Sequence, residues 1–507
     1  MKNSVRYKRR SKRSGAVKRR LVALAALAAI AVAVWAVLRP HAPPAPVAAV
    51  PVRVATLAPA TPQPAPWSAS AIAQLRSELN ASFASALSTR YSLAVIDASG
   101  RVIYADHDGD AVAPASVQKL IVADAALGML GPDYRFHTLL VAGGAPANGT
   151  IDGDLWLVGS GDPSLRSDDL RAAANLLSRR GVHEIDGSVA IDASLMGPPE
   201  MNPRWDPDDD NEDYQVPTSA VSLDDDTAEF RVYGGSPGTA ARVAVVPESS
   251  DVHLSGQVTS SSGADSVVIA TDAPNEFDLG GYVPADTEEK FRLPVHNMPV
   301  YAGAVLENML ADAHIGTTNA PVVAKAPLDT VALWDHRSAP LRVLIQHMLF
   351  VSDNHYAEQL MRTLAIDAGE RGDDADGLAA EQRFLRSRSI PTPGLRVFDG
   401  SGLAQSNRIA AITLARILSD AQLRGPGSDL YRLLPSGGRE GTLADYDFTS
   451  ASGRVRAKTG HLSDASSLAG YVTTKRHGRV AFAFMINDSP GDPDSAYVSA
   501  VDRIANF

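Results

Sequence analysis

The longest uninterrupted apolar segment of the chain is Leu21–Leu38, eighteen residues without a charge. Ten Lys and Arg residues precede it within positions 1–20, and Arg39-Pro40 follows it directly. A run of this length is near the minimum for a membrane-spanning helix, and the basic flank indicates a cytoplasmic N-terminus. We expect an uncleaved signal anchor over 21–38, with the body of the chain extracytoplasmic. A cleaved signal peptide and a buried core helix are the alternatives.

A proline-rich segment separates this apolar run from the rest of the chain. Nine of the 33 prolines lie within residues 39–66, together with many alanines. Such a composition predicts a semi-extended linker rather than a folded unit. We therefore expect a linker over 39–67 and folded structure from residue 68 onward.

The pattern after the linker mixes helical and strand-like spacing. Apolar residues recur at helical spacing over 70–87, and alternating runs at 91–97 and 101–105 predict a β-hairpin. Further helical patterns cover Ala302–Leu310, Leu341–Phe350, Ala357–Ala365 and Ala496–Ala505, and further strand patterns cover Val455–Thr459, Leu468–Thr473 and Val480–Ile486. Helices combined with an antiparallel sheet predict an α+β fold.

Residues 143–295 differ from both flanks. They are rich in Gly, Asp, Ser and Thr, and their apolar runs are short and strand-like. We expect one or two inserted β-containing domains there. The insert would divide the main domain into a first part at 68–142 and a second part at 296–507.

Composition and charge narrow the possible chemistry. The chain has 507 residues and no cysteine, which excludes disulfides, thiol nucleophiles and zinc–thiolate sites. Its net charge is −11, but residues 1–39 hold eleven basic and no acidic residues. The remainder therefore has 36 basic (47 − 11) and 58 acidic residues, a net charge of −22. A body this acidic argues against a nucleic-acid partner.

Three short motifs stand out, in the order Ser116-Val-Gln-Lys119, Ser352-Asp-Asn354 and Lys458-Thr459-Gly460. This order of S-x-x-K, S-x-N and K-T-G is typical of serine enzymes that attack D-alanyl-D-alanine amides or β-lactams. Lysine usage supports the assignment. The chain has nine lysines and 38 arginines, and Lys119 is the only lysine with a serine three residues before it. A desolvated lysine can lose its proton near neutral pH, whereas arginine cannot.

The first two motifs suggest roles for their side chains. Ser116 lies at the start of a helical pattern, with Lys119 one turn later on the same face. A serine hydroxyl is a weak nucleophile until a base removes its proton, and Lys119 can be that base. Ser352 can relay a proton to the leaving amine, and Asn354 can hold either the substrate backbone or Lys119. In isolation, the first motif would indicate only an N-capping serine and a surface lysine.

The third motif is expected to bind substrate. Lys458 adds a second positive charge that would help to lower the pKa of Lys119 and would attract a substrate carboxylate. We assign Thr459, Gly460 and His461 to substrate binding. The backbone N–H groups of Ser116 and His461 are the candidates for an oxyanion hole.

With these motifs the chain resembles the low-molecular-mass class C penicillin-binding proteins, the D-alanyl-D-alanine carboxypeptidase/endopeptidase family. The resemblance covers roughly residues 70–507 and includes the spacing of 236 residues between Ser116 and Ser352. Further matching segments are Leu130–Phe136, Gly161–Leu165, Tyr301–Ala304, Asp399–Leu403 and Gly441–Leu443. One departure is His461, where relatives often have serine, so the side chain offered to substrate differs.

The resemblance implies a serine β-lactamase/penicillin-binding transpeptidase-like domain that carries the insert. It further implies a D-Ala-D-Ala carboxypeptidase and cross-link endopeptidase that acts on bacterial peptidoglycan through an acyl-enzyme on Ser116, needs no cofactor and is acylated by β-lactams. The alternative of the same class is a β-lactamase, which must deacylate fast. The alternative of another class is a catalytically silent wall-binding protein, against which the intact motif residues argue.

Two other patterns are better explained as surface turns or loops than as catalytic or metal-binding sites. Gly234-Gly-Ser-Pro-Gly238 fits a G-x-S-x-G nucleophile elbow, but Pro237 lacks the N–H that this motif uses as an oxyanion donor, so a turn is favoured. Asp206–Asp210 begins like a calcium loop, but Asn211 and Pro217 stand where glycine and glutamate are required, so a solvated acidic loop is favoured. No H-E-x-x-H pairing is present, which disfavours a zinc-dependent carboxypeptidase, and we expect no metal site.

Overall fold

The computed structural model describes residues 64–209, 211–425 and 430–507. The predicted cytoplasmic tail, signal anchor and most of the linker, at 1–63, lie outside the described residues, so the anchor over 21–38 stays a prediction. Within the described part, no helix is both long and apolar enough to cross a bilayer.

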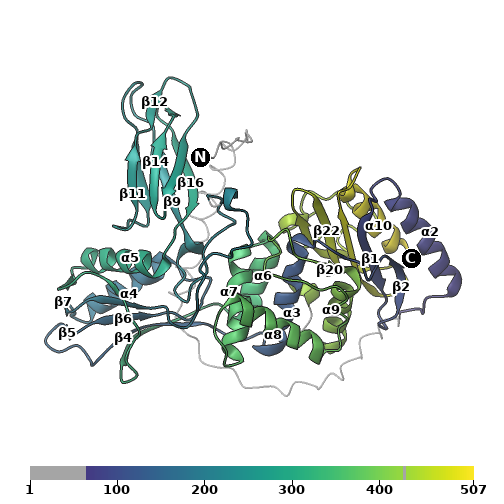
Figure 1. The fold of residues 1–507 in the computed structure, drawn as a ribbon, viewed down its shortest axis with the longest axis horizontal. Coiled ribbons are helices and arrows are strands. Elements are labelled where there is room, and N and C mark those ends of the chain that lie inside the picture. Colours follow the sequence, from purple (N-terminus) through teal and green to yellow (C-terminus); the bar gives the residue numbers. More distant parts are fainter. Residues whose placement is uncertain (1–63, 210, 426–429) are drawn as a thin grey trace, which may run out of the picture. The chain divides into compact units, whose positions relative to one another are not determined.

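The main domain is built on a five-stranded sheet in the order β2-β1-β23-β22-β21, with antiparallel neighbours throughout (Figure 1). Its strands are β1 (Arg90–Ile96), β2 (Val102–Asp106), β21 (Val455–His461), β22 (Ala465–Thr473) and β23 (Arg479–Asn487). The first hairpin thus joins strands from the far end of the chain. A short pair, β3 (Ala111–Val112) and β20 (Ile409–Ala410), lies beside it.

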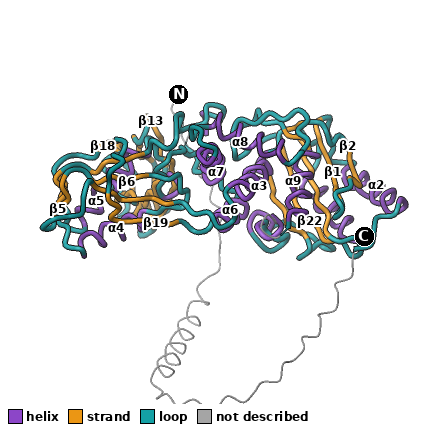
Figure 2. Tube along the Cα trace, turned by 90° about the horizontal axis from the view of Figure 1, so that it is seen from below, coloured by secondary structure: helices purple, strands orange, loops and turns teal. Residues whose placement is uncertain are grey.

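Helices cover both faces of this sheet. Figure 2 shows its strands between α2 (Ala69–Phe83) and α9 (Ala411–Arg424). The C-terminal helix α10 (Pro493–Asn506) packs on α2, and α3 (Lys119–Met129) packs on α9. The sheet is therefore the middle of three layers, as expected for an α+β fold.

Strand β23 shows why the sheet accepts a helix layer on each face. Phe482, Phe484 and Ile486 belong to the core on the α2 and α10 side. Ala481 and Ala483 alternate with them and face the core on the α3 and α9 side. Successive side chains of a strand point to opposite faces, so this alternation of large and small residues gives each helix layer its own packing surface.

Three more helices pack around α3 in the same core: α6 (Leu341–Val351), α7 (Asn354–Asp367) and α8 (Asp374–Ser387). All residues of α7 from His355 to Ala365 are buried. A helix that is buried on all sides has neighbours on all sides, so α7 can connect several parts of the molecule.

A second core lies outside this sheet and contains both helices and strands. Its helices are α4 (Ser167–Arg179) and α5 (Met298–Asp312). A mixed sheet in the order β18-β8-β6-β4-β19 consists of β18 (Val322–Val323), β8 (Val189–Asp192), β6 (Leu155–Val158), β4 (His137–Ala142) and β19 (Val331–Arg337). Beside it, a three-stranded sheet pairs β17 (Gly316–Thr317), β7 (Glu184–Asp186) and β5 (Thr150–Asp152).

The remaining strands form smaller sheets that share this second core. One sheet has β10 (Arg242–Val246), β9 (Thr227–Tyr233) and β16 (Glu288–Pro294), and another has β11 (His253–Gly256), β14 (Glu276–Gly280) and β13 (Val268–Ala273). Strands β12 (Thr259–Ser261) and β15 (Tyr282–Pro284) pair separately. Gly234–Gly238 connects β9 to β10, and the Gly235 N–H donates to Ser260 Oγ (2.8 Å), so this segment is a turn between strands.

The second core takes in residues on both sides of the predicted insert at 143–295. Strand β4 precedes that range, and α5 and β19 follow it. Strand β4 belongs to the second core because it pairs with β6 on one side and with β19 on the other. Helix α4 lies inside the stretch that composition indicated as β-containing.

Arg362 on α7 ties the chain around residues 197–218 to the main domain. Its side chain is 1% exposed, and its guanidinium donates to the carbonyl oxygens of Gly197 (3.0 Å) and Pro199 (2.5 Å). The Nε atom donates to Asp374 Oδ1 (2.8 Å) on α8. Replacement would leave the partly buried Asp374 carboxylate and the two carbonyl oxygens without this donor.

We expect Arg362→Met to lower the free energy of unfolding by at least about 2 kcal/mol, because a buried guanidinium that donates to a carboxylate and to carbonyl oxygens is lost, and a hydrogen bond to a charged group contributes roughly 1.5–3 kcal/mol. The matched control is Arg383→Met, which removes the half-exposed pair of Arg383 with Glu370. That change should cost below about 1 kcal/mol. Urea unfolding followed by tryptophan fluorescence measures both. Equal losses in the two variants would contradict the anchoring role of Arg362.

Candidate active site

Ser116 lies on a short 3₁₀ helix, Ala115–Gln118, that runs directly into α3. Ala115 has a left-handed backbone conformation (φ 51°), which is uncommon for a residue with a side chain. Gly402 packs against this bend, since a Cβ at Gly402 would lie 2.1 Å from the Ala115 carbonyl oxygen. The bend and the close packing place Ser116 at the start of the helix, with Lys119 one turn later.

The Lys119 amine has three partners. Its Nζ lies 2.9 Å from Ser116 Oγ, 2.7 Å from Asn354 Oδ1 and 2.8 Å from the Ser401 carbonyl oxygen. An ammonium group would donate to all three. A neutral amine has only two N–H bonds, so its lone pair is free to accept the Ser116 proton. The structure therefore brings the predicted nucleophile, base and asparagine together in a geometry that permits this transfer.

Burial sets the protonation of the two lysines. Lys119 is fully buried, and the loss of solvent lowers its pKa to about 8, although Glu358, Asp399 and Asp353 act in the opposite direction. Burial, followed by the repulsion of Lys119, also lowers the pKa of Lys458 well below its usual value. Because the two ammonium groups repel each other, the state in which only one of the two lysines is protonated is favoured over the state in which both are.

The second motif joins two helices. Ser352 is the C-cap of α6 in a left-handed conformation (φ 65°), and Asp353 caps α7 by accepting from the Tyr356 N–H (3.1 Å). Burial would raise the pKa of Asp353, but its pKa is lowered because His347 hydrogen-bonds to it (3.2 Å) and His355 is near. This tight helix–turn–helix aims Asn354 at Lys119.

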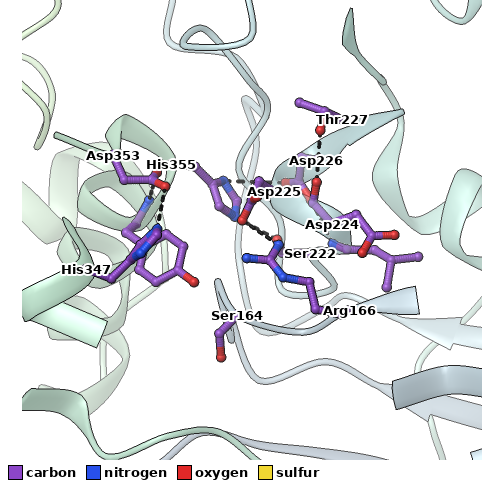
Figure 3. Close-up of polar contacts among 12 residues, drawn as sticks. Ser164, Arg166, Ser222, Asp224, Asp225, Asp226, Thr227, His347, Asp353 and His355 are labelled. Atoms are coloured by element: carbon purple, nitrogen blue, oxygen red, sulfur yellow. Dashed lines mark hydrogen bonds and ion pairs between the residues drawn. The ribbon is translucent and has the colours of Figure 1, made fainter. Parts of the chain in front are cut away.

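The same motif is anchored to the second core through the next residue of α7. Figure 3 shows His355 between Asp353 and the segment that carries Ser222 and Asp226. Its Nε2 lies 2.7 Å from Ser222 Oγ, and its Nδ1 lies 3.7 Å from Asp226 Oδ2. All three of these side chains are buried. The amide of Asn354 also donates to the Tyr214 carbonyl oxygen (2.8 Å), so the region between the first two motifs touches the site directly.

The third motif lies on the edge strand β21 beside the 3₁₀ helix of Ser116. A Cβ at Gly460 would lie 2.8 Å from the Ser116 nitrogen, so only glycine allows this approach. Lys458 is fully buried and donates to the Thr459 carbonyl oxygen (2.7 Å). The hydroxyl of Thr459 donates to Thr442 Oγ1 (2.8 Å).

His461 follows the K-T-G triplet with its side chain half-exposed. Its Nε2 lies 2.9 Å from Asp494 Oδ2 at the start of α10, and Ser466 donates to the other Asp494 oxygen (2.7 Å). Burial by itself would raise the pKa of Asp494, but its hydrogen bonds with His461 and Ser466 lower that pKa overall. The imidazole is therefore held at the edge of the site by a carboxylate.

An open cleft of about 890 Å³ contains the candidate residues Ser116, Ser352, Asn354 and His461. The rest of its lining comes from three loops, at residues 203–215, 402–406 and 462–463. The acidic loop at Asp206–Asp209 is thus part of the cleft wall. No group of three or more His, Asp or Glu side chains in the described ranges has an arrangement suited to a metal ion.

Several site residues were not found from the sequence. Trp205 lines the cleft, and its Nε1 donates to the buried Asp399 (3.0 Å). Asp399 also accepts from the backbone N–H groups of Gly402 (2.9 Å) and Ala404 (2.6 Å), which shapes the turn behind Lys119. The segments Asp399–Leu403 and Gly441–Leu443 match the resembled family, and that match is the sequence signal that points to Asp399 and Thr442.

The fold and this site together define a serine enzyme of the penicillin-recognising class. The serine–lysine pair begins a helix beside an antiparallel sheet, and the edge strand of that sheet carries the K-T-G triplet. Residues 82–506 match the D-Ala-D-Ala carboxypeptidase 3 (S13) family, and the chain belongs to this family. The predictions of a low-molecular-mass class C penicillin-binding protein and of a serine-type D-Ala-D-Ala carboxypeptidase are thereby confirmed.

Individual relatives agree with this membership. The chain is 29% identical over 90% of its length to a D-alanyl-D-alanine carboxypeptidase of Actinomadura sp. (strain R39), covering 89% of that protein. It is 30% identical to carboxypeptidase Rv3627c of Mycobacterium tuberculosis, covering 77% of this chain and 74% of the relative. The crystal structure of penicillin-binding protein 4 from Haemophilus influenzae has the same fold, with a TM-score of 0.72 at 24% identity over 85% of this chain and 97% of that one.

We expect Lys119→Arg to slow acylation by a β-lactam at least about a hundredfold, because a guanidinium keeps its proton and cannot act as a base. In the wild type, the rate should fall roughly tenfold per pH unit below pH 8, since only the neutral amine is active and burial places its pKa at about 8. Stopped-flow acylation measures both quantities. Lys475→Arg, at an exposed lysine, is the matched control. A Lys119→Arg rate within a few-fold of wild type would limit Lys119 to an electrostatic role.

Proposed function

We propose that this carboxypeptidase cleaves D-alanyl-D-alanine in peptidoglycan stem peptides, and D-alanyl cross-links between them, through an acyl-enzyme on Ser116. The observation that carries the proposal is the Lys119 amine, fully buried and 2.9 Å from Ser116 Oγ. Its pKa of about 8 leaves roughly a tenth of the amine neutral at pH 7. A base with a pKa close to the working pH is the most effective kind.

In the first half-reaction, Ser116 Oγ attacks the carbonyl carbon of the penultimate D-alanine while Lys119 Nζ takes the hydroxyl proton. The N–H groups of Ser116 and His461 stabilise the oxyanion. The carbon–nitrogen bond then breaks, and the leaving amine receives the proton from Lys119 through the Ser352 hydroxyl. The C-terminal residue departs and the peptide remains as an ester on Ser116.

In the second half-reaction, water attacks this ester. Lys119 takes a proton from the water, the bond between Ser116 Oγ and the acyl carbon breaks, and Lys119 returns the proton to Ser116 Oγ. The products are the shortened peptide acid and the original enzyme. The same residues thus act in both halves of the reaction.

The third motif orients the substrate in this scheme. Thr459, Gly460 and His461 contact the substrate backbone and the carboxylate next to the scissile bond. A carboxylate beside Thr459 favours the protonated form of Lys458. Repulsion between the two lysines then favours the neutral form of Lys119, so substrate binding itself promotes the basic state.

The open cleft supports action on cross-links as well as on free stem peptides. Its volume of about 890 Å³ leaves room for a residue more bulky than D-alanine beyond the scissile bond. Acylation by β-lactams is supported by the structure of the Haemophilus influenzae protein in complex with a β-lactam, which has the same fold (TM-score 0.69).

The first test is intact-mass spectrometry after incubation with benzylpenicillin. A lasting increase by the mass of one intact penicillin is expected, and Ser116→Ala, matched in fold, should show none. An adduct that turns over within seconds would indicate a β-lactamase instead. Purified peptidoglycan should then lose terminal D-alanine and cross-linked dimers on digestion. Intact peptidoglycan would indicate a wall-binding protein without activity.

We also propose that the body is held outside the cytoplasm of a bacterial cell by the apolar segment 21–38. The support is its length, its basic flank and the proline-rich linker that follows. The full-length protein should remain in the membrane fraction after a high-salt wash, whereas a chain that begins at residue 39 should not. A soluble mature form that starts after residue 39 in cells expressing the full chain would identify a cleaved signal peptide.

A further inference from the structure

Glu358 is a buried carboxyl group one helical turn after Asn354 on α7. Residues four apart lie on the same face of a helix, so Glu358 shares the face of Asn354, which contacts Lys119 (2.7 Å). The Glu358 side chain is 1% exposed. Its carboxylate oxygens accept from the Gly400 N–H (3.0 and 3.1 Å) and from the Ser401 N–H (2.8 Å). A carboxylate that accepts from backbone donors on one turn fixes that turn in place.

This turn connects Glu358 to the active-site lysine. The Ser401 N–H is held by Glu358, and the carbonyl oxygen of the same residue accepts from Lys119 Nζ (2.8 Å). The turn packs closely against α7, since a Cβ at Gly400 would lie 2.9 Å from the Ala357 carbonyl oxygen. The position of one of the three acceptors of Lys119 therefore depends on Glu358.

Glu358 and Lys119 also influence each other's protonation. Among the carboxylates that raise the pKa of Lys119 against the effect of burial, Glu358 is the strongest, followed by Asp399 and Asp353. Glu358 is itself surrounded by acidic groups. Burial and then the charges of Asp399 and Asp374 raise its pKa to about 8, while the Gly400 and Ser401 donors oppose the shift. Glu381 on α8 also faces this group.

We propose that Glu358 is a positioning residue for the base: it holds the Gly400–Ser401 turn and so keeps the Ser401 carbonyl on the Lys119 amine. The inference rests on the proposed function of Lys119. It differs from a packing role, because an apolar side chain of similar size at position 358 would fill the space but could not accept from the Gly400 and Ser401 N–H groups.

The chain offers a matched control in Glu381. It is also 1% exposed, and neither of its carboxylate oxygens has a hydrogen-bond partner within the described residues. Burial raises its pKa well above the usual value, with Glu358 and Asp399 adding to the shift. Glu381→Met therefore removes a buried carboxyl group close to Glu358 without removing a hydrogen bond to the turn.

The test is the pH profile of acylation by a chromogenic cephalosporin, measured with the full chain. Glu358→Met keeps the approximate size of the side chain but accepts from neither backbone N–H group, so misplacement of the Ser401 carbonyl should lower the plateau rate at least about tenfold. Glu358→Gln keeps one acceptor oxygen and should recover part of this loss. Glu381→Met should leave the plateau within about twofold. A Glu358→Met plateau within about twofold of wild type, or the same loss in Glu358→Met and Glu381→Met, would overturn the proposal.

Gly400→Ala tests the position of the turn with Glu358 intact. Its added Cβ would lie 2.9 Å from the Ala357 carbonyl oxygen and displaces the turn, so the plateau should fall. If Glu358→Met does not fold, an unchanged plateau in Gly400→Ala overturns the proposal on its own. Failure of the proposed function is distinguishable, because the wild type would then form no penicillin adduct at all, whereas failure of this inference alone leaves the wild-type adduct intact.

Discussion

The Lys119 amine is enclosed in the core of the main domain, and its hydrogen bonds to Ser116, Asn354 and Ser401 satisfy all its donors when it is protonated. An ammonium group in a protein interior is tolerated only with such partners, and even then its pKa falls. These three partners come from different segments of the chain. The surrounding structure is organised so that these acceptors meet at one nitrogen atom.

Helix α7 is the element on which most of these requirements converge. Asn354 and Glu358 place one acceptor directly and another through the turn at Ser401. Further along the same helix, Arg362 holds the carbonyls near residues 197–199, and His355 contacts Ser222. The helix is buried on all sides because it makes contacts of this kind in several directions. The second core therefore contributes to the site through its contacts with α7, and the loop that carries Trp205 and Tyr214 lines the cleft.

Much of the main domain could be predicted from local pattern. The hairpin of β1 and β2, the strands β22 and β23 and the helix α10 each lie within a residue or a few of the expected ranges, because a strand or helix with a buried face repeats its apolar residues at a characteristic period. Helix α4 was missed, although its buried residues Leu170, Ala173, Ala174 and Leu177 have clear helical spacing. The Gly- and Asp-rich composition of the surrounding residues led to a prediction of β structure there. Composition averages over a whole region, so it cannot reveal a single helix within it.

The sequence by itself determined the three motifs, their order and the chemical class, because a serine–lysine pair one turn apart depends only on helix geometry and on residue type. It did not determine that Trp205, Tyr214, Thr442, Ser401 and Glu358 belong to the same site. These residues lie far from the motif residues in sequence or, like Glu358, act through a turn some forty positions away, and no periodicity connects such segments. Only tertiary packing brings them within hydrogen-bond distance. The basicity of Lys119 is decided at that level as well, since it depends on burial and on the charges that folding places around the amine.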